Sequence, residues 1–249
     1  MDITRVIARL DLKDHNVVKG YQLEGLRVLG DAHLFANEYY ARGADEIFLN
    51  DVVASLFGRR SLLETISKIT ESIHIPVTVC GGIGSMEDVT NLMNVGADRV
   101  AINSAAIARP QLIREIADKY GSQAISISIE AKQTAKGIWT AFFDSGRESS
   151  KLEVFNWIAT CEEMNAGEII LTSVDRDGTL KGPDTALIEK ACSMTSIPIV
   201  VSGGFSKVSQ IDQLRKIARF EGIAIGKAFH LGELSVEEVK SLFLGNVSS

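Results

Sequence analysis

Cysteine is scarce in this chain. Its 249 residues include three cysteines, Cys80, Cys161 and Cys192, an odd number without the paired spacing of a zinc site. The sequence therefore gives no indication of a disulfide framework or of a structural metal. We expect three small apolar side chains that are mostly buried, and no bound metal ion.

Long apolar runs and an excess of basic charge are also missing. The N-terminal segment "MDITRVIARLDLKD" is interrupted by Arg5, Arg9 and Asp11, which neither a signal peptide nor a membrane span tolerates. The formal net charge of -6 gives no broad basic surface for a nucleic-acid backbone or an anionic membrane. With no dinucleotide-binding fingerprint either, the sequence predicts a cytoplasmic globular protein without a cofactor, a nucleic-acid partner or a membrane partner.

Short apolar runs recur along the whole chain. Each has little alternation, which is typical of parallel strands that are covered on both faces, and amphipathic segments separate most of them. Such an alternation over about 250 residues predicts one α/β domain, a single (β/α)8 TIM barrel over residues 1–249. The expected strands are "RVIARLDL", "EIFLND", "IPVTVC", "DRVAIN", "AISISIE", "EIILTSV", "IPIVVS" and "GIAIG".

The chain also repeats its own plan. The pair Gly81-Gly82 and the pair Gly203-Gly204 lie 122 positions apart, and the same spacing separates "EIFLND" from "EIILTS". This period is close to half of the chain. We therefore interpret the barrel as two (β/α)4 half-barrel repeats, about residues 1–121 and 122–249.

Each Gly-Gly pair is expected at the C-terminal end of a strand, the face where barrel enzymes have their active sites. Glycine lets a ligand approach the backbone closely and leaves amide groups free for an anion. The next strand of each half runs into "INSAA" or "AIGKA", which is typical of a helix start that favours phosphate. Two such cups would hold a ligand with a phosphate at each end. The alternative is that these glycines only relieve crowding.

Two carboxylates are expected between the cups. Asp11 ends the first predicted strand and Glu130 ends the fifth, so the repeat places them on opposite walls of one mouth. Two such groups can share acid and base work where their surroundings separate their pKa values. Lys19 and the run "DRDGT", residues 175–179, add polar groups on the loops after the first and sixth strands. The alternative for an acidic residue on a loop is a turn or a cap.

These motifs resemble the cyclase subunits of imidazole glycerol phosphate synthase, a family of the histidine pathway. The resemblance rests on "LDLKD…VVKG", "VTVCGGI…GADRVAINSAA", "GSQA", "GEIILTSVDRDGT" and "SGGF", in order from residue 5 to about 230. It implies a bis-phosphate ribulosyl formimino aminoimidazole carboxamide ribonucleotide as substrate. Ammonia from a glutaminase subunit, docked at the N-terminal face of the barrel as a heterodimer, would convert it to imidazole glycerol phosphate and an aminoimidazole carboxamide ribonucleotide.

The resemblance also implies roles for individual residues. Asp11 and Glu130 would be catalytic. Substrate and phosphate would contact Lys19, Gly82, Asn103, Ser104, Asp177, Gly178, Gly204, Gly226 and Lys227. A ring of four charged residues at the strand starts, Arg5, Glu46, Arg99 and Glu168, would gate the entry of ammonia. The alternative for these four is a set of solvated strand ends.

Five departures from the family pattern leave other functions open. Glu130 replaces an aspartate, Arg9 a small cysteine, His15 a loop glycine, Arg99 a lysine and Lys227 a small hydroxyl residue. The runner-up is therefore a cyclase-like subunit that channels ammonia for the amidation of a sugar in surface-polysaccharide biosynthesis. An aminoaldose isomerase with the same repeat is a further alternative, against which stand the "DRDGT" run and the ring of charges. A non-catalytic activator of a glutaminase is another, against which stand the two intact cups.

Overall fold

The eight apolar runs lie side by side as parallel strands that close on themselves. The structure, a computed structural model, describes residues 4–22, 24–53 and 59–244. The strands pair in chain order, and the pairing of Arg5 with Gly222 closes the ring, so the predicted (β/α)8 barrel is confirmed. The barrel strands are β1 (Arg5–Lys13), β4 (Glu46–Asp51), β5 (Val77–Cys80), β6 (Arg99–Ile102), β7 (Ile125–Ala135), β10 (Glu168–Ser173), β11 (Ile199–Ser202) and β12 (Gly222–Ile225).

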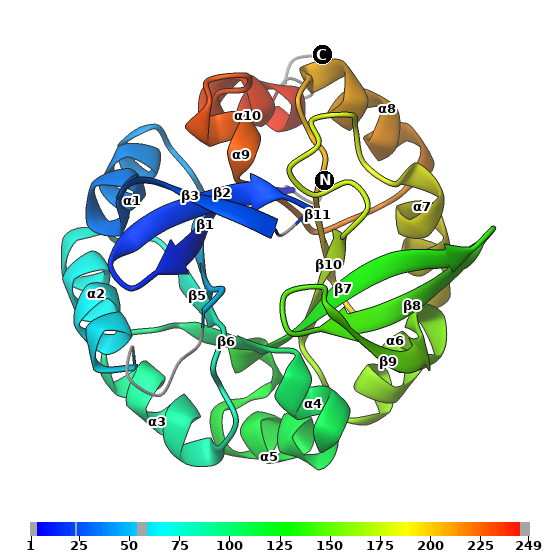
Figure 1. Ribbon diagram of the computed structural model, residues 1–249, viewed down its shortest axis with the longest axis horizontal. Coiled ribbons are helices and arrows are strands. Elements are labelled where there is room, and N and C mark those ends of the chain that lie inside the picture. The colour runs from blue at the N-terminus through cyan, green and yellow to red at the C-terminus, as the bar shows by residue number, and fades with distance from the viewer. Residues whose placement is uncertain (1–3, 23, 54–58, 245–249) are drawn as a thin grey trace.

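Helices form an outer ring around the strands (Figure 1). Their starts follow from the sequence where a side chain caps them: Asp31 accepts hydrogen bonds from the backbone amides of His33 and Leu34, and Ser85 forms a capping box with Asp88. The helices are α1 (Ala32–Ala41), α2 (Arg59–Ser72), α3 (Met86–Asn94), α4 (Ser104–Ala108), α5 (Gln111–Tyr120), the 3-10 turn η1 (Ser122–Ala124), α6 (Val154–Glu163), α7 (Thr185–Met194), α8 (Val208–Ile217), α9 (Lys227–His230) and α10 (Val236–Leu244).

The barrel wall separates two apolar clusters. Because successive side chains of a strand point to opposite faces, Val6 and Ala8 of β1 pack in the large cluster that includes the helices, whereas Ile7 belongs to a separate one. The inner cluster fills the barrel with Ile7, Phe48, Cys80, Ala101, Ile170, Val200 and Ala224. The side chains above and below this apolar layer are polar or charged.

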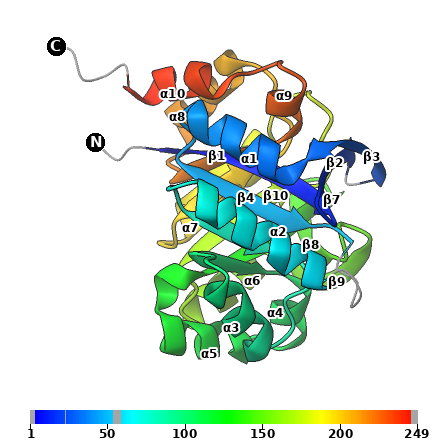
Figure 2. The ribbon, with the colours of Figure 1, turned by 90° about the vertical axis from the view of Figure 1, so that its left-hand side faces the viewer.

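Two antiparallel hairpins extend the barrel sheet. One consists of β2 (Asn16–Tyr21) and β3 (Glu24–Asp31), which follow β1, and the other of β8 (Ile138–Phe143) and β9 (Glu148–Glu153), which follow β7. They lie on opposite sides of the barrel opening (Figure 1) and at the end opposite to the start of β1 (Figure 2). The hairpins thus occupy equivalent places in the two proposed half-barrels, whose boundary stays a prediction.

The hairpins correct two details of the sequence prediction. Lys19 lies in strand β2 and not on a loop, and Asp11 and Glu130 do not end their strands, because β1 continues to Lys13 and β7 to Ala135. Both strands continue because an antiparallel partner pairs with their last residues. The two carboxylates nevertheless remain at the level of the barrel mouth.

The part of the chain that the structure describes contains no helix that is long and apolar enough to cross a membrane. Within the same residues, no group of three or more histidine, cysteine, aspartate or glutamate side chains could hold a metal ion.

Candidate active site

Asp11 lies in the mouth of the barrel with a fully occupied carboxylate. Its Oδ2 accepts from Lys19 Nζ at 2.5 Å, and its Oδ1 accepts from Arg9 Nε at 2.9 Å and from Asn50 Nδ2 at 3.0 Å. Burial alone would raise the pKa of this carboxyl, but the charges of Arg9 and Lys19 outweigh burial and hold the pKa well below its usual range. Asp11 is therefore ionised at any pH near neutrality.

Lys19 joins Asp11 to the second half of the barrel. Its buried ammonium lies between Asp11 and Asp177, with 3.2 Å to Asp177 Oδ2. The backbone amide of Gln22 donates to the carbonyl of Asp177 at 2.9 Å, so the hairpin β2–β3 is tied to the loop after β10. The polar groups predicted on separate segments thus form one network.

Glu130 lies across the mouth from Asp11, on β7. Its Oε2 accepts from the backbone amide of Gly146 at 2.7 Å. Burial raises the pKa of this carboxyl to about 7, against the lowering effects of the Gly146 amide and of Arg9. Glu130 can therefore both give and take a proton near neutral pH.

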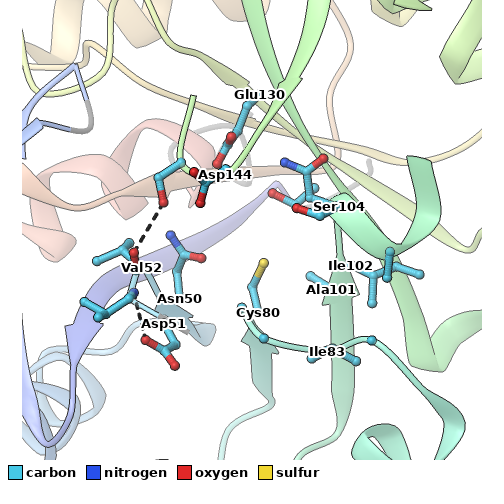
Figure 3. A pocket seen from close by; sticks show the side chains of 18 of the residues that line it. Asn50, Asp51, Val52, Cys80, Ile83, Ala101, Ile102, Ser104, Glu130 and Asp144 are labelled. Atoms are coloured by element: carbon cyan, nitrogen blue, oxygen red, sulfur yellow. Dashed lines mark hydrogen bonds between the residues drawn. The ribbon is translucent and has the colours of Figure 1, made fainter. Parts of the chain in front are cut away.

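The first cup is an open pocket of about 550 Å³ beside Glu130. Figure 3 shows Asn50, Cys80, Ser104 and Glu130 around this pocket. Gly81 and Gly82 form its floor with positive φ angles, and a Cβ on Gly81 would lie 2.2 Å from the carbonyl oxygen of Asp51. The backbone can therefore pass here only as glycine. Gly82, Asn103 and Ser104 all line this pocket, as the sequence predicts.

The second cup is much smaller. Its cavity measures about 20 Å³ and is lined by the predicted group of Asp177, Gly178, Gly204, Gly226 and Lys227, among others. The reason is that Lys227 Nζ donates to the carbonyl oxygen of Gly178 at 2.7 Å. The lysine thus occupies space that the equivalent cup leaves open.

A closed ring of charge lies at the opposite end of the barrel interior. Arg5 forms ion pairs with both Glu46 and Glu168, and Arg99 does the same at 3.3 and 3.2 Å. The two glutamates are almost fully buried, and such burial is tolerable because each faces two guanidinium groups. The four residues predicted as a ring are therefore together, and not separate solvated strand ends.

Comparisons with known proteins agree with this arrangement. The model of the family described as histidine biosynthesis protein matches residues 5–235. The chain is 48% identical over 212 residues to the imidazole glycerol phosphate synthase subunit HisF of Legionella pneumophila, which covers 85% of this chain and 100% of that relative. It is 39% identical to the subunit HisF of Lactococcus lactis over 244 residues, 97% of this chain and 94% of the relative.

The chain belongs to the histidine biosynthesis protein family. A third relative, the subunit HisF of Methanopyrus kandleri, is 38% identical and covers 95% of this chain and 93% of its own length. The similarity to the HisF subunits thus extends over nearly the entire barrel. The resemblance inferred from the motifs is confirmed.

The structure of this member of the histidine biosynthesis family adds site groups that sequence reasoning missed. Asn50 holds Asp11, the amide of Gly146 holds Glu130, and Thr78 and Ser126 donate to the ring glutamates at 2.6 and 3.1 Å. Asn50 was detectable, because it stands at the end of the strand motif "EIFLND", where polar side chains face the mouth. The role of Gly146 had no sequence signal, because it depends on how the hairpin β8–β9 folds back.

Proposed function

We propose that this chain is the cyclase subunit of imidazole glycerol phosphate synthase. The observation that carries the proposal is the pair of carboxylates, Asp11 and Glu130, on opposite walls between two glycine cups, in a chain that aligns almost end to end with HisF subunits. The bis-phosphate ribulosyl formimino aminoimidazole carboxamide ribonucleotide would lie across the mouth. Ammonia converts it there to imidazole glycerol phosphate and an aminoimidazole carboxamide ribonucleotide.

The chain's own groups have separate tasks in this reaction. Gly82, Asn103 and Ser104 bind one phosphate, and the amides and the ammonium of the second cup bind the other. Asp11 remains ionised and stabilises positive charge that develops when ammonia attacks. Glu130, with a pKa of about 7, exchanges the protons of the ring-closing steps.

Ammonia reaches this site from a separate glutaminase subunit in the cytoplasm. We place the docking surface at the N-terminal face of the barrel, because the charged ring lies there with Arg5 and Arg99 partly exposed. The ring would admit ammonia into the barrel interior when one of its ion pairs opens.

One observation favours the runner-up function. Lys227 donates to Gly178 beside the second cup, which among the described residues is a much smaller cavity than the first. A subunit that only delivers ammonia, for the amidation of a sugar in surface-polysaccharide biosynthesis, has no need of two open cups.

A steady-state assay of the purified chain separates these functions. The bis-phosphate ribulosyl substrate and an ammonium salt are supplied at pH about 8.5, above the pKa of Glu130, without a partner. The cyclase would be supported by turnover that Asp11→Asn abolishes and that a control variant leaves unchanged. The control is Asp118→Asn, at an exposed position on α5. Binding of the substrate without turnover by the wild-type chain would contradict it and support ammonia delivery.

A further inference from the structure

Arg9 is a buried cation inside the barrel. Its side chain is 4% exposed and leaves β1 on the inner face, like that of Asp11 two residues later. The guanidinium carbon lies 5.8 Å from the ring centre of Phe48, a member of the apolar layer inside the barrel. Arg9 thus lies between that layer and the carboxylates of the mouth.

The guanidinium is held from three strands. Nε donates to Asp11 at 2.9 Å, and Nη1 donates to Thr172 Oγ1 on β10 at 3.1 Å and to Ser202 Oγ on β11 at 3.2 Å. Since β12 separates β1 from β11, the side chain reaches across part of the barrel interior. These three acceptors fix the planar guanidinium group, here called the fork of Arg9, in one orientation. The ammonium group of a lysine could not reproduce it.

Arg9 and Lys19 both pair with Asp11, but they lie on different kinds of element. Lys19 lies on the hairpin β2–β3, whereas Arg9 is bound to barrel strands. A substrate phosphate that attracts Lys19 would take this ammonium from Asp11. The contact of Arg9 with Asp11 would persist.

Glu130 faces a cluster of charged groups in which the positive charge of Arg9 opposes the negative charges of the carboxylates. Among the groups around it, the carboxylates of Asp11 and Asp177 raise its pKa, and the Gly146 amide and Arg9 lower it. The charged side chains that line the same pocket as Glu130 are Asp51, Arg109, Asp144 and Arg147. The nearby Cys80 thiol, whose pKa burial raises to about 12, stays neutral. Without Arg9, Lys19 would be the cation left between the two carboxylates of the cluster.

We propose that Arg9 is a positioning residue for both carboxylates: its fork fixes the orientation of Asp11, and its charge faces Glu130 across the barrel. The kinetic part of this inference rests on the proposed cyclase function, and the electrostatic part does not. The side chain of Arg9 donates to Asp11, Thr172 and Ser202, so Arg9 acts through the carboxylates.

The electrostatic part is tested without substrate. The carboxyl carbon of Glu130 is titrated by NMR in glutamate-labelled chain, with Glu130→Gln to assign the signal. In Arg9→Met, which keeps an unbranched apolar stem but removes the guanidinium and its charge, the midpoint should rise by about one pH unit, because a nearby opposite charge is lost. Arg9→Lys should titrate like wild type. A midpoint in folded Arg9→Met equal to that of wild type would overturn this part.

The positioning part is tested in the ammonium-dependent assay. Arg9→Met should lower kcat by roughly 100-fold, as expected for a displacement of about 1 Å of a catalytic group, with KM within about threefold. Arg9→Lys should recover only part of kcat, since it restores the charge but not the fork. Thr172→Val, which removes one acceptor of the fork and keeps the charge, should lower kcat without moving the Glu130 midpoint.

These results separate the possible failures. A wild-type chain without turnover would contradict the proposed function, while the titration would still decide whether Arg9 acts on Glu130. Unchanged kcat in both Arg9→Lys and Thr172→Val would overturn the positioning role. If Arg9→Met does not fold, Arg9→Gln makes the same comparison, because it removes the charge and is too short to replace Nη1 at Thr172 and Ser202 but keeps a polar amide in the buried site.

Discussion

At the scale of residues, the pKa values of two carboxyl groups in one barrel mouth are shifted in opposite directions. Asp11 is buried between two cations, and its pKa lies well below its usual range, whereas Glu130 is buried with one amide, and the charge of Arg9 acts on it against those of Asp11 and Asp177, so that its pKa is about 7. Burial acts on both in the same direction, so the difference comes from the neighbouring charges. This separation makes Glu130 the carboxyl that can exchange a proton near neutral pH, and it leaves Asp11 permanently negative.

Asp11→Asn should lose turnover and keep substrate binding. The amide preserves the shape of the side chain but removes the charge that Lys19 and Arg9 face, and these cations then repel positive charge that develops on the substrate. We expect kcat to fall by about 1000-fold or more, a size typical of a lost electrostatic contact, with the dissociation constant of the substrate within about threefold. Stopped turnover together with lost binding would instead indicate a structural role.

Glu130→Gln should stabilise the fold at alkaline pH. The pKa of Glu130 is about 7 in the folded chain against an ordinary 4.5, so the protonated form is the one that the fold prefers. Its contribution is fully present below pH 4.5 and is lost as the pH rises through 7. Glutamine keeps the neutral state at every pH, so its free energy of unfolding should exceed that of wild type by about 1–3 kcal/mol at pH about 8.5.

Denaturant unfolding at two pH values checks this expectation. The difference between the two proteins should vanish near pH 4.5, the ordinary value, and grow towards pH about 8.5. Equal stabilities at both pH values would contradict the raised pKa. The same variant should lose the pH dependence of kcat around 7.

At the scale of elements, the strand ends carry the two carboxylates and the two cups, and the hairpins add contacts to them. The apolar runs and the period of 122 residues predicted the barrel, the Gly-Gly turns and the two facing carboxylates, because strand ends of a barrel converge at one face. The hairpins had no comparable signal: β3 has mostly exposed side chains, and its pairing depends on β2 rather than on a buried pattern. The contact between Gly146 and Glu130 is a consequence of the second hairpin and could not be predicted either.

The contacts of the long side chains Lys227 and Arg9 could not be predicted from the sequence either. Nothing in "AIGKA" tells whether Lys227 points to solvent or into the cup, and the answer depends on the carbonyl of Gly178 on another segment. Likewise, Arg9 reaches Thr172 and Ser202 because β10 and β11 follow β12 around the ring. Such contacts follow from the closed barrel and not from local pattern.

Gly204→Val should weaken binding before it affects chemistry. Gly204 has a φ of +88°, and a Cβ there would lie 2.3 Å from the carbonyl oxygen of Gly182, so the turn that forms the second cup has to shift. We expect KM to rise about tenfold or more, equivalent to ~1.4 kcal/mol of binding, with a smaller change in kcat. The measurement is a substrate titration in the ammonium-dependent assay.

Gly43→Val is the matched control for that variant. Its φ of +86° imposes the same backbone strain, but nothing lies within 4 Å of the added Cβ, and the residue is in the turn between α1 and β4. It should therefore lower stability without raising KM. A similar rise of KM in both variants would show that strain, and not the cup, is responsible.

At the scale of the whole molecule, the barrel has a charged ring at one end and the carboxylate mouth at the other, with an apolar layer between them. The ring is closed in this structure, because each arginine bridges both glutamates. Four charges of alternating sign that neutralise one another form a barrier that a small neutral molecule such as ammonia can pass when one pair opens. On the proposed function, ammonia would cross the barrel interior from this ring to the mouth.

Arg99→Met should uncouple the two faces without affecting the mouth. Loss of this guanidinium leaves Glu46 and Glu168 paired with Arg5 alone and opens one side of the ring. With ammonium salt, turnover should stay within about twofold of wild type, because Arg99 contacts neither the cups nor the mouth carboxylates Asp11 and Glu130. With glutamine and the glutaminase subunit, ammonia escapes at the opened side, so more than one glutamate forms for each imidazole glycerol phosphate.

The ratio of these two products, measured in the same reaction, decides the matter. Arg114→Met is the control, because Arg114 lies on the outer helix α5 and donates to the carbonyl of Glu163, away from the barrel interior. Its product ratio should equal that of wild type. A ratio of one glutamate per imidazole glycerol phosphate in Arg99→Met would mean that the ring only stabilises this end of the barrel. A fall in the ammonium-dependent rate would mean that the substitution disturbs the mouth through the fold and not through the supply of ammonia.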